Sequence, residues 1–272
     1  MKDARLRVHS LVAALVLLAL TALNANAQED GSDFLADLHT FRISNYMALD
    51  AYYRFSGTGT TDTLNEIVAG INSANDAMNR LTQSTDEVLS KDQLSTLSQE
   101  FEKFKGLMRD NINDVRTQGY PDLRLVSDMA NQALAMNNMA TELYLEAQES
   151  SQTQTNPRVE AARMAAVKMA QMMAKYAVRT NSSVTQTFQG SATETPLDAQ
   201  AREFDALLEQ VRQGPAEGEL RALLDDISSK WQFIRGSYIN YNENNVGFVI
   251  DRYSKAILSS LGSAIELLQN SH

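Results

Sequence analysis

Residues 158–188 read RVEAARMAAVKMAQMMAKYAVRTNSSVTQTF. Apolar side chains recur along this stretch at intervals of three and four residues, at Val159, Ala162, Ala166, Met169, Met173 and Tyr176. Because an α-helix turns once every 3.6 residues, this spacing places them on one face. Pro157 precedes the stretch and suits the first position of a helix. The stretch therefore predicts a long amphipathic helix over 157–188, rich in Ala and Met.

The same spacing continues outward in both directions, and no alternating strand pattern competes with it. One stripe, for example, has intervals of three and four residues and consists of Leu94, Leu97, Phe101, Phe104, Met108, Ile112 and Val115. The chain is therefore expected to be all-α. The predicted helices cover 33–55, 62–82, 92–117, 121–149, 157–188, 197–212, 217–242 and 247–270.

The breaks between these helices have the residue types of turns and caps. Residues 56–61 read SGTGTT, and Asp62 is expected to cap the second helix. A second break, at 119–121, reads GYP, and a polar run at 150–157 ends in proline. We expect the polar run to divide the chain into one four-helix unit over 28–152 and another over 153–272.

The two units resemble each other when the chain is shifted by 127 positions. The shift aligns Leu97 with Leu224 and Phe104 with Trp231, and it places the break at 118–121 on residues 245–248. Identities are few, so the order of the helices carries the argument. We interpret the chain as two tandem up-down four-helix bundles, although unrelated helical bundles can also be brought into register.

The first 27 residues have the pattern of a secretory signal peptide. A positive start with Lys2, Arg5 and Arg7 precedes a largely apolar run at 11–23 and the small-residue sequence Ala25-Asn26-Ala27. The apolar run is too short to span a bilayer as a helix, which favours cleavage over an uncleaved anchor. The mature chain is expected to begin at Gln28 and to lie in the periplasm of a Gram-negative bacterium.

The charge of the chain limits its partners. Removal of residues 1–27 takes away three positive charges and one negative charge, so the net charge falls from −10 to −12. DNA and anionic membranes are themselves negative, so nucleic acid is excluded as an expected partner.

One motif in the second unit points to a family. Residues 168–175 read KMAQMMAK, close to the RMLSQRMAK motif on the first helix of the PilJ-type periplasmic sensory domain. Later features of that domain are an acidic–aromatic pair, a Leu-rich helix and a helix centred on Trp. They are matched by Glu203-Phe204, Leu207-Leu208 and Trp231. The second unit resembles this domain of type IV pilus chemotaxis receptors, which is related to nitrate-sensing helical domains. The first unit resembles it more loosely, through Asn45-Tyr46-Met47-Ala48.

The resemblance implies a sensory function, but the chain departs from the family in two respects. The two arginines of the motif fall at Val167 and Met172, and neither side chain replaces the guanidinium that holds an anion in nitrate sensors. Tight nitrate binding at that place is therefore not expected. Family members continue into a second membrane span and a signalling domain, whereas this sequence ends at His272, so we expect it to act through a membrane partner.

The residue inventory favours a non-enzymatic protein without a cofactor. The chain has no cysteine, and its histidines are His9, His39 and His272. Thiol catalysis and multi-histidine zinc or di-iron sites are thereby excluded. No serine has a base in a recognisable motif, and no glycine-rich phosphate loop occurs.

Three groups of side chains are ambiguous. The methionines of 129–173 suit flexible core packing better than a Cu(I) site. Four basic residues on the 157–188 helix fit a solvated face, although they could also line an anion pocket or face a partner. They are Arg163, Lys168, Lys175 and Arg179. The aromatic residues of 231–253 are expected mostly in the core, although some could line a ligand cleft between helices. The candidate ligand-binding residues are Arg163, Lys168, Met172, Lys175 and Trp231.

Two functions remain in view. The first is a periplasmic sensory, ligand-binding or adaptor protein that works through an envelope or inner-membrane signalling protein. The alternative is a structural envelope interaction protein with no small ligand. Expected partners are that signalling protein, a small partly apolar ligand and a second copy of the chain in a homodimer.

Overall fold

The computed structural model describes residues 33–84, 88–150, 155–181, 195–243 and 245–270, and within them it contains helices and turns but no strand. The first helix covers 33–58. It is followed by α2 (Thr61–Gln83), α3 (Lys91–Gln118), α4 (Leu123–Ser150), α5 (Pro157–Asn181), α6 (Leu197–Arg212), α7 (Gly218–Ile239) and α8 (Gly247–Gln269). The all-α prediction is confirmed. The predicted signal peptide and the predicted end of the 157–188 helix lie outside the described residues.

The helix ends follow the turn chemistry of the sequence, with one correction. The expected cap, Asp62, lies in the first turn of α2, and the preceding Thr60 is the N-cap, with its Oγ1 accepting from Thr63 N–H at 3.4 Å. The negative charge of Asp62 instead stabilises the start of α2, because the helix dipole is positive at this end. Ser90 and Gln93 form a capping box at the start of α3, and Gly119 ends it in the left-handed region with φ of 82°.

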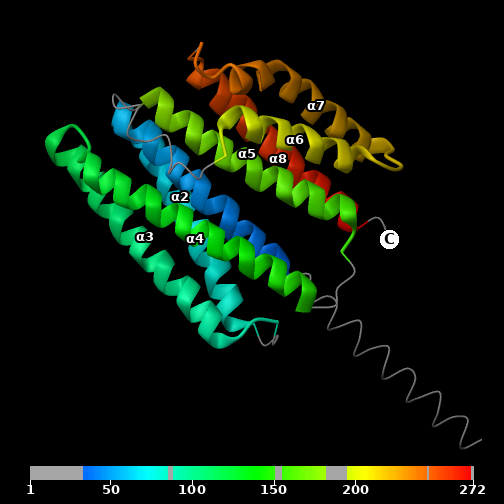
Figure 1. Cartoon of the computed structure of the whole chain (residues 1–272), viewed down its shortest axis with the longest axis horizontal. Helices are drawn as coiled ribbons and strands as arrows, with labels where there is room; N and C mark the ends of the chain where they lie inside the picture. Colours follow the sequence, from blue (N-terminus) through cyan, green and yellow to red (C-terminus); the bar gives the residue numbers. More distant parts are fainter. Residues whose placement is uncertain (1–32, 85–87, 151–154, 182–194, 244, 271–272) are drawn as a thin grey trace, which may run out of the picture.

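The buried side chains form two hydrophobic cores. The first contains side chains of the first helix and of α2, α3 and α4, and the second contains side chains of α5, α6, α7 and α8. Figure 1 shows the blue to green helices on one side, the yellow to red helices on the other, and α5 between them. In the second core α5 packs against α6 and α8, and α7 packs against α8 and α6.

Helix α5 takes part in both cores, which corrects the expectation of a single buried face. Ala170 and Ala174 pack into the first core, and Met169 and Met173 pack into the second. The small alanine side chains allow neighbouring helices to approach α5 from both sides. The methionines fill the irregular space on the second side, so the prediction that Met169 and Met173 are core residues is confirmed.

A glycine sets the closest approach between the first helix and α2. A Cβ atom at Gly70 would lie 3.0 Å from the backbone nitrogen and 3.1 Å from the Cα of Ala48. The two helices therefore meet backbone to backbone at this point. None of the helices in the described part of the chain is both long and apolar enough to cross a membrane.

Candidate functional site

A cleft of about 310 Å³ opens where the two cores meet. The first helix and α2 supply one wall, and α5 and the start of α8 supply the other. Its polar lining residues are Asp50, Arg54, Thr58, Asp62, Thr63, Glu66, Tyr176, Thr180, Asn181 and Asp251. The cleft therefore brings together residues that lie up to two hundred positions apart in the sequence.

Arg54 is at the centre of the charged wall of this cleft. Its Nε and Nη2 donate to Oδ2 of Asp50 at 3.1 and 2.9 Å. Nη2 also donates to Oε2 of Glu66 on α2, and Nε lies 3.3 Å from Oδ1 of Asp251 on α8. One guanidinium thus contacts carboxylates from three helices, and these contacts raise its pKa even though burial acts in the opposite direction.

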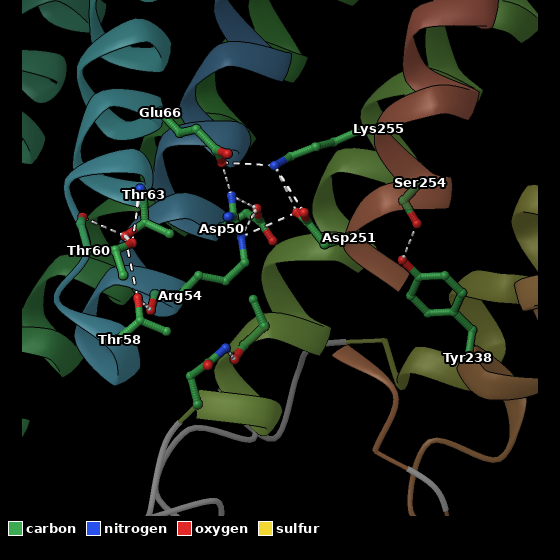
Figure 2. A network of polar contacts seen from close by, with 12 residues as sticks. Asp50, Arg54, Thr58, Thr60, Thr63, Glu66, Tyr238, Asp251, Ser254 and Lys255 are labelled. Carbon is green, nitrogen blue, oxygen red and sulfur yellow. Dashed lines mark hydrogen bonds and ion pairs between the residues drawn. The ribbon is translucent and has the colours of Figure 1, made fainter. Parts of the chain in front are cut away.

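Lys255 completes the network from α8. Its Nζ donates to Oε2 of Glu66 at 2.8 Å and to Oδ2 of Asp251 at 3.1 Å. Figure 2 shows Lys255 and Arg54 reaching the same carboxylates from opposite sides. Two cations and three carboxylates therefore connect the first helix and α2, which belong to the first core, with α8 of the second core.

The carboxylates of the network have different protonation behaviour. Asp50 is buried, and burial raises the pKa of its carboxyl from 3.8 to about 6, with Arg54 acting against the rise. For Glu66 burial also acts upward, but the hydrogen bonds from Arg54 and Lys255 outweigh it and lower the pKa. Asp50 therefore takes up a proton at a higher pH than Glu66 does.

The opposite wall of the cleft is largely apolar. It contains Met173 and Ala177 of α5 together with Phe248 and Ile250 of α8. Phe248 is 78% exposed, the largest exposed fraction among the large apolar side chains of the described residues. Tyr176 is buried, and its hydroxyl accepts from the backbone N–H of Val246 at 3.2 Å. The cleft thus combines an ionic wall with an apolar and aromatic wall, as ligand sites commonly do.

The five candidate residues from the sequence do not meet in this cleft. Lys168 on α5 pairs with Glu203 of α6 at 2.6 Å, and Lys175 donates to the carbonyl of Thr195 at 2.9 Å. Met172 is buried in the second core and does not line the cleft. The sequence therefore predicted candidate residues on α5, but the cleft is lined by residues of α5 other than the predicted ones.

Trp231 also has a structural role. Its ring is buried and contacts Phe204 at a centroid distance of 4.5 Å. The indole Nε1–H donates to Oδ1 of Asp205 at 2.7 Å, and Arg235 donates to both oxygens of the same carboxylate. Burial opposes ionisation of Asp205, but these hydrogen bonds lower its pKa. Of the aromatic residues of 231–253, Phe248 rather than Trp231 lines the cleft.

Arg163 corrects the prediction of a solvated basic face on α5. Its side chain is only 1% exposed, and Nη1 donates to the hydroxyl of Tyr144 on α4 at 3.0 Å and to Oε1 of Glu160 at 3.3 Å. Arg42 of the first helix is buried beside it, with its guanidinium 4.9 Å from the ring centre of Tyr144. Sequence spacing missed this because α5 is covered on two sides.

His39 belongs to the same buried cluster. Burial lowers its pKa well below 6.5, and the positive charges of Arg163 and Arg42 act in the same direction. Its Nδ1 has no hydrogen-bond partner among the described residues. His39 is therefore a neutral core histidine.

The two positions that align with the anion-binding arginines of the PilJ-type motif hold apolar side chains that pack in hydrophobic cores. Val167 packs into the first core and Met172 into the second, on different sides of α5. They offer no hydrogen-bond donor to an anion. Among the described residues, no three histidine, aspartate or glutamate side chains are grouped to hold a metal ion.

The residues of the ionic wall were missed by reasoning from the sequence. A weak indication existed, because Asp50 and Arg54 are four positions apart, as are Asp251 and Lys255, and such pairs are common on helix surfaces. These two pairs differ from ordinary surface pairs only because they contact each other across the two cores.

Searches against protein-family models, curated proteins and solved structures find no match to this chain.

Proposed function

We propose that this chain is a non-enzymatic periplasmic sensory or adaptor protein that binds a small ligand in the cleft. The single observation that supports this most is that the cleft is lined by helices of both cores. A molecule bound there contacts both halves of the fold. It can therefore favour one relative placement of the halves over another, which is what a sensor needs in order to pass a signal to an envelope or inner-membrane partner.

The finer architecture is part of the proposal. We infer two tandem four-helix bundles of the PilJ type, over 28–152 and 153–272, after a signal peptide cleaved before Gln28. Burial agrees with the 127-residue register, because Leu97 and Leu224 are both buried and so are Phe104 and Trp231. Mass spectrometry of the exported protein tests the cleavage site, and retention of Met1 would contradict it.

The alternative function, a structural envelope protein without a ligand, has one observation in its favour. The ion pairs of Arg54 with Asp251 and of Lys255 with Glu66 join the two cores directly. In that case the cleft is a by-product of packing, and the exposed Phe233 on α7 is a better candidate for a protein contact.

Thermal unfolding in the presence of a chemically diverse set of small molecules distinguishes the two functions. A ligand that binds the folded state raises the melting temperature, and the rise grows with its concentration. We expect at least one class of compound to produce this rise in the wild type and to lose it in Phe248→Ala. We expect nitrate to produce none, because Val167 and Met172 offer it no donors. If no compound changes the melting temperature, the ligand-binding function is wrong.

A further inference from the structure

The charges around the cleft are unbalanced. Four carboxylates line it, those of Asp50, Asp62, Glu66 and Asp251, and the cations in contact with them are Arg54 and Lys255. Four negative and two positive groups leave a formal charge of −2 when all are ionised. An anion would therefore be repelled from this cleft, and a cation would be attracted to it.

Two of these carboxylates have capacity left for a further donor. Asp62 is exposed at the start of α2 and makes no ion pair with any described residue. Oδ1 of Asp251 is buried and lies 3.0 Å from Lys255 Nζ and 3.3 Å from Arg54 Nε, yet the angles make no hydrogen bond to it. An oxygen that makes ion pairs but accepts no hydrogen bond has lone pairs left for a further charged donor.

The remaining lining suits the body of an organic cation better than a bare metal ion. Met173, Ala177 and Ile250 provide an apolar surface, and Phe248 provides an exposed aromatic ring at the edge of the cleft. Aromatic rings attract ammonium groups through their electron-rich faces. A volume of about 310 Å³ is at the lower end of the range for small-molecule sites, so the ligand is small.

We propose that the ligand of this cleft is a small organic cation, an ammonium group on an apolar or aromatic body. The ammonium group is bound by Asp62 and Asp251, and the body packs against Met173 and Phe248. This inference rests on the proposed ligand-binding function and adds the chemical class of the ligand. It also accounts for the exposure of Phe248, because a bound ligand would cover part of its ring.

Three compounds of similar shape and different charge test the assignment. They are the 2-phenylethylammonium ion, the neutral 2-phenylethanol and the phenylacetate anion, each titrated into the full chain by calorimetry and by thermal unfolding. We expect the cation to bind, the alcohol to bind at least about tenfold more weakly, and the anion not to bind. Binding of the cation should weaken as salt is added, because salt screens the exposed Asp62.

Matched variants locate the binding. Asp62→Asn should weaken binding of the cation by about threefold to tenfold, whereas Asp128→Asn, the same change on an exposed residue of α4 outside the cleft, should have no effect. Phe248→Ala should weaken it by about threefold or more, whereas Phe233→Ala, on the exposed surface of α7, should not. Each variant changes an exposed side chain, so the fold is retained.

The outcomes separate the two proposals. If 2-phenylethylammonium does not bind, or binds without sensitivity to Asp62→Asn and Phe248→Ala, the assignment of an organic cation is wrong. If the neutral or the anionic compound binds as tightly as the cation or more tightly, and Phe248→Ala weakens it, the ligand class is wrong but the cleft remains a ligand site. If no compound of any charge binds, both proposals fail.

Discussion

Nζ of Lys255 on α8 lies 2.8 Å from Oε2 of Glu66 on α2, although the two residues are 189 positions apart in the chain. The pair connects a helix of the second core with a helix of the first. Lys255 also contacts Asp251, and Glu66 also contacts Arg54, so neither partner is isolated. The contact therefore reports directly on how the two halves of the fold are placed.

Replacing this pair should destabilise the protein by a small, measurable amount. Both side chains are partly exposed, so solvent screening limits their coupling to about 0.5–1 kcal/mol. A double-mutant cycle with Lys255→Met and Glu66→Gln, measured by urea unfolding, gives this coupling. Lys103 and Glu100, which pair within the single helix α3, provide the control cycle. Equal coupling free energies in the two cycles would mean that the network around Lys255 and Glu66 does not strengthen their interaction beyond that of a pair within one helix.

Asp50 should make the protein more stable as the pH falls from 7.5 to 5. Its pKa is raised to about 6 in the fold from 3.8, so the folded state holds a proton that the unfolded state has released. The stabilising effect of this raised pKa is present below pH 3.8 and is lost as the pH rises through 6. Between pH 7.5 and 5 the wild type should gain about 1 kcal/mol relative to Asp50→Asn.

Urea unfolding of both proteins at the two pH values measures this gain. The comparison isolates Asp50, because all other titrating groups are common to the two proteins. Asp128→Asn, on the exposed surface of α4, should show the same pH dependence as the wild type. Parallel pH profiles for the wild type and Asp50→Asn would contradict the burial of an ionisable Asp50.

His39 should act in the opposite direction over the same pH range. Burial and the charges of Arg163 and Arg42 keep it neutral in the fold, while the unfolded chain binds a proton below about pH 6.5. Stability is therefore lost as the pH falls through 6.5. His39→Gln removes this loss, so the variant should gain stability relative to the wild type between pH 7.5 and 5, by at most about 2 kcal/mol.

The same unfolding measurements test the histidine. The charged groups that act on it are the guanidinium groups of Arg163 on α5 and Arg42 on the first helix. Near-ultraviolet circular dichroism establishes whether the glutamine variant keeps native packing. If a natively packed variant has the same pH profile as the wild type, His39 titrates in the fold as it does in the unfolded chain and the prediction is wrong.

Gly70 should not tolerate alanine, although alanine is the better helix former by about 1 kcal/mol. The added Cβ would lie 3.0 Å from the backbone of Ala48, so the first helix and α2 would have to separate. We expect Gly70→Ala to destabilise the protein by about 1–3 kcal/mol. Gly106→Ala on α3 is the matched control, because no atom lies within 4 Å of its added Cβ. That variant should be as stable as the wild type or more stable, and the opposite order of the two variants would be inconsistent with the close approach at Ala48.

The helices themselves could be predicted from the sequence because their determinants are local. The expected span 92–117 corresponds to α3, Lys91–Gln118, and the span 197–212 corresponds to α6 at both ends. Spacing of apolar residues specifies which side chains share a face, and turn residues specify where a helix ends. The burial of Met169 and Met173 could be predicted from the same spacing.

The two-sided burial of α5 and the cleft were decided by the tertiary structure. Periodicity identifies the face of a helix that turns toward a core, but it does not show which other helix covers the remaining faces. Arg163 is spaced like a solvated residue and is buried because α4 and the first helix lie on that side of α5. Glu66 and Lys255 each have the pattern of an ordinary surface charge. They are 189 positions apart in the sequence, and they belong to one network because packing of the two cores brings their side chains into contact. No local pattern of residues encodes that contact.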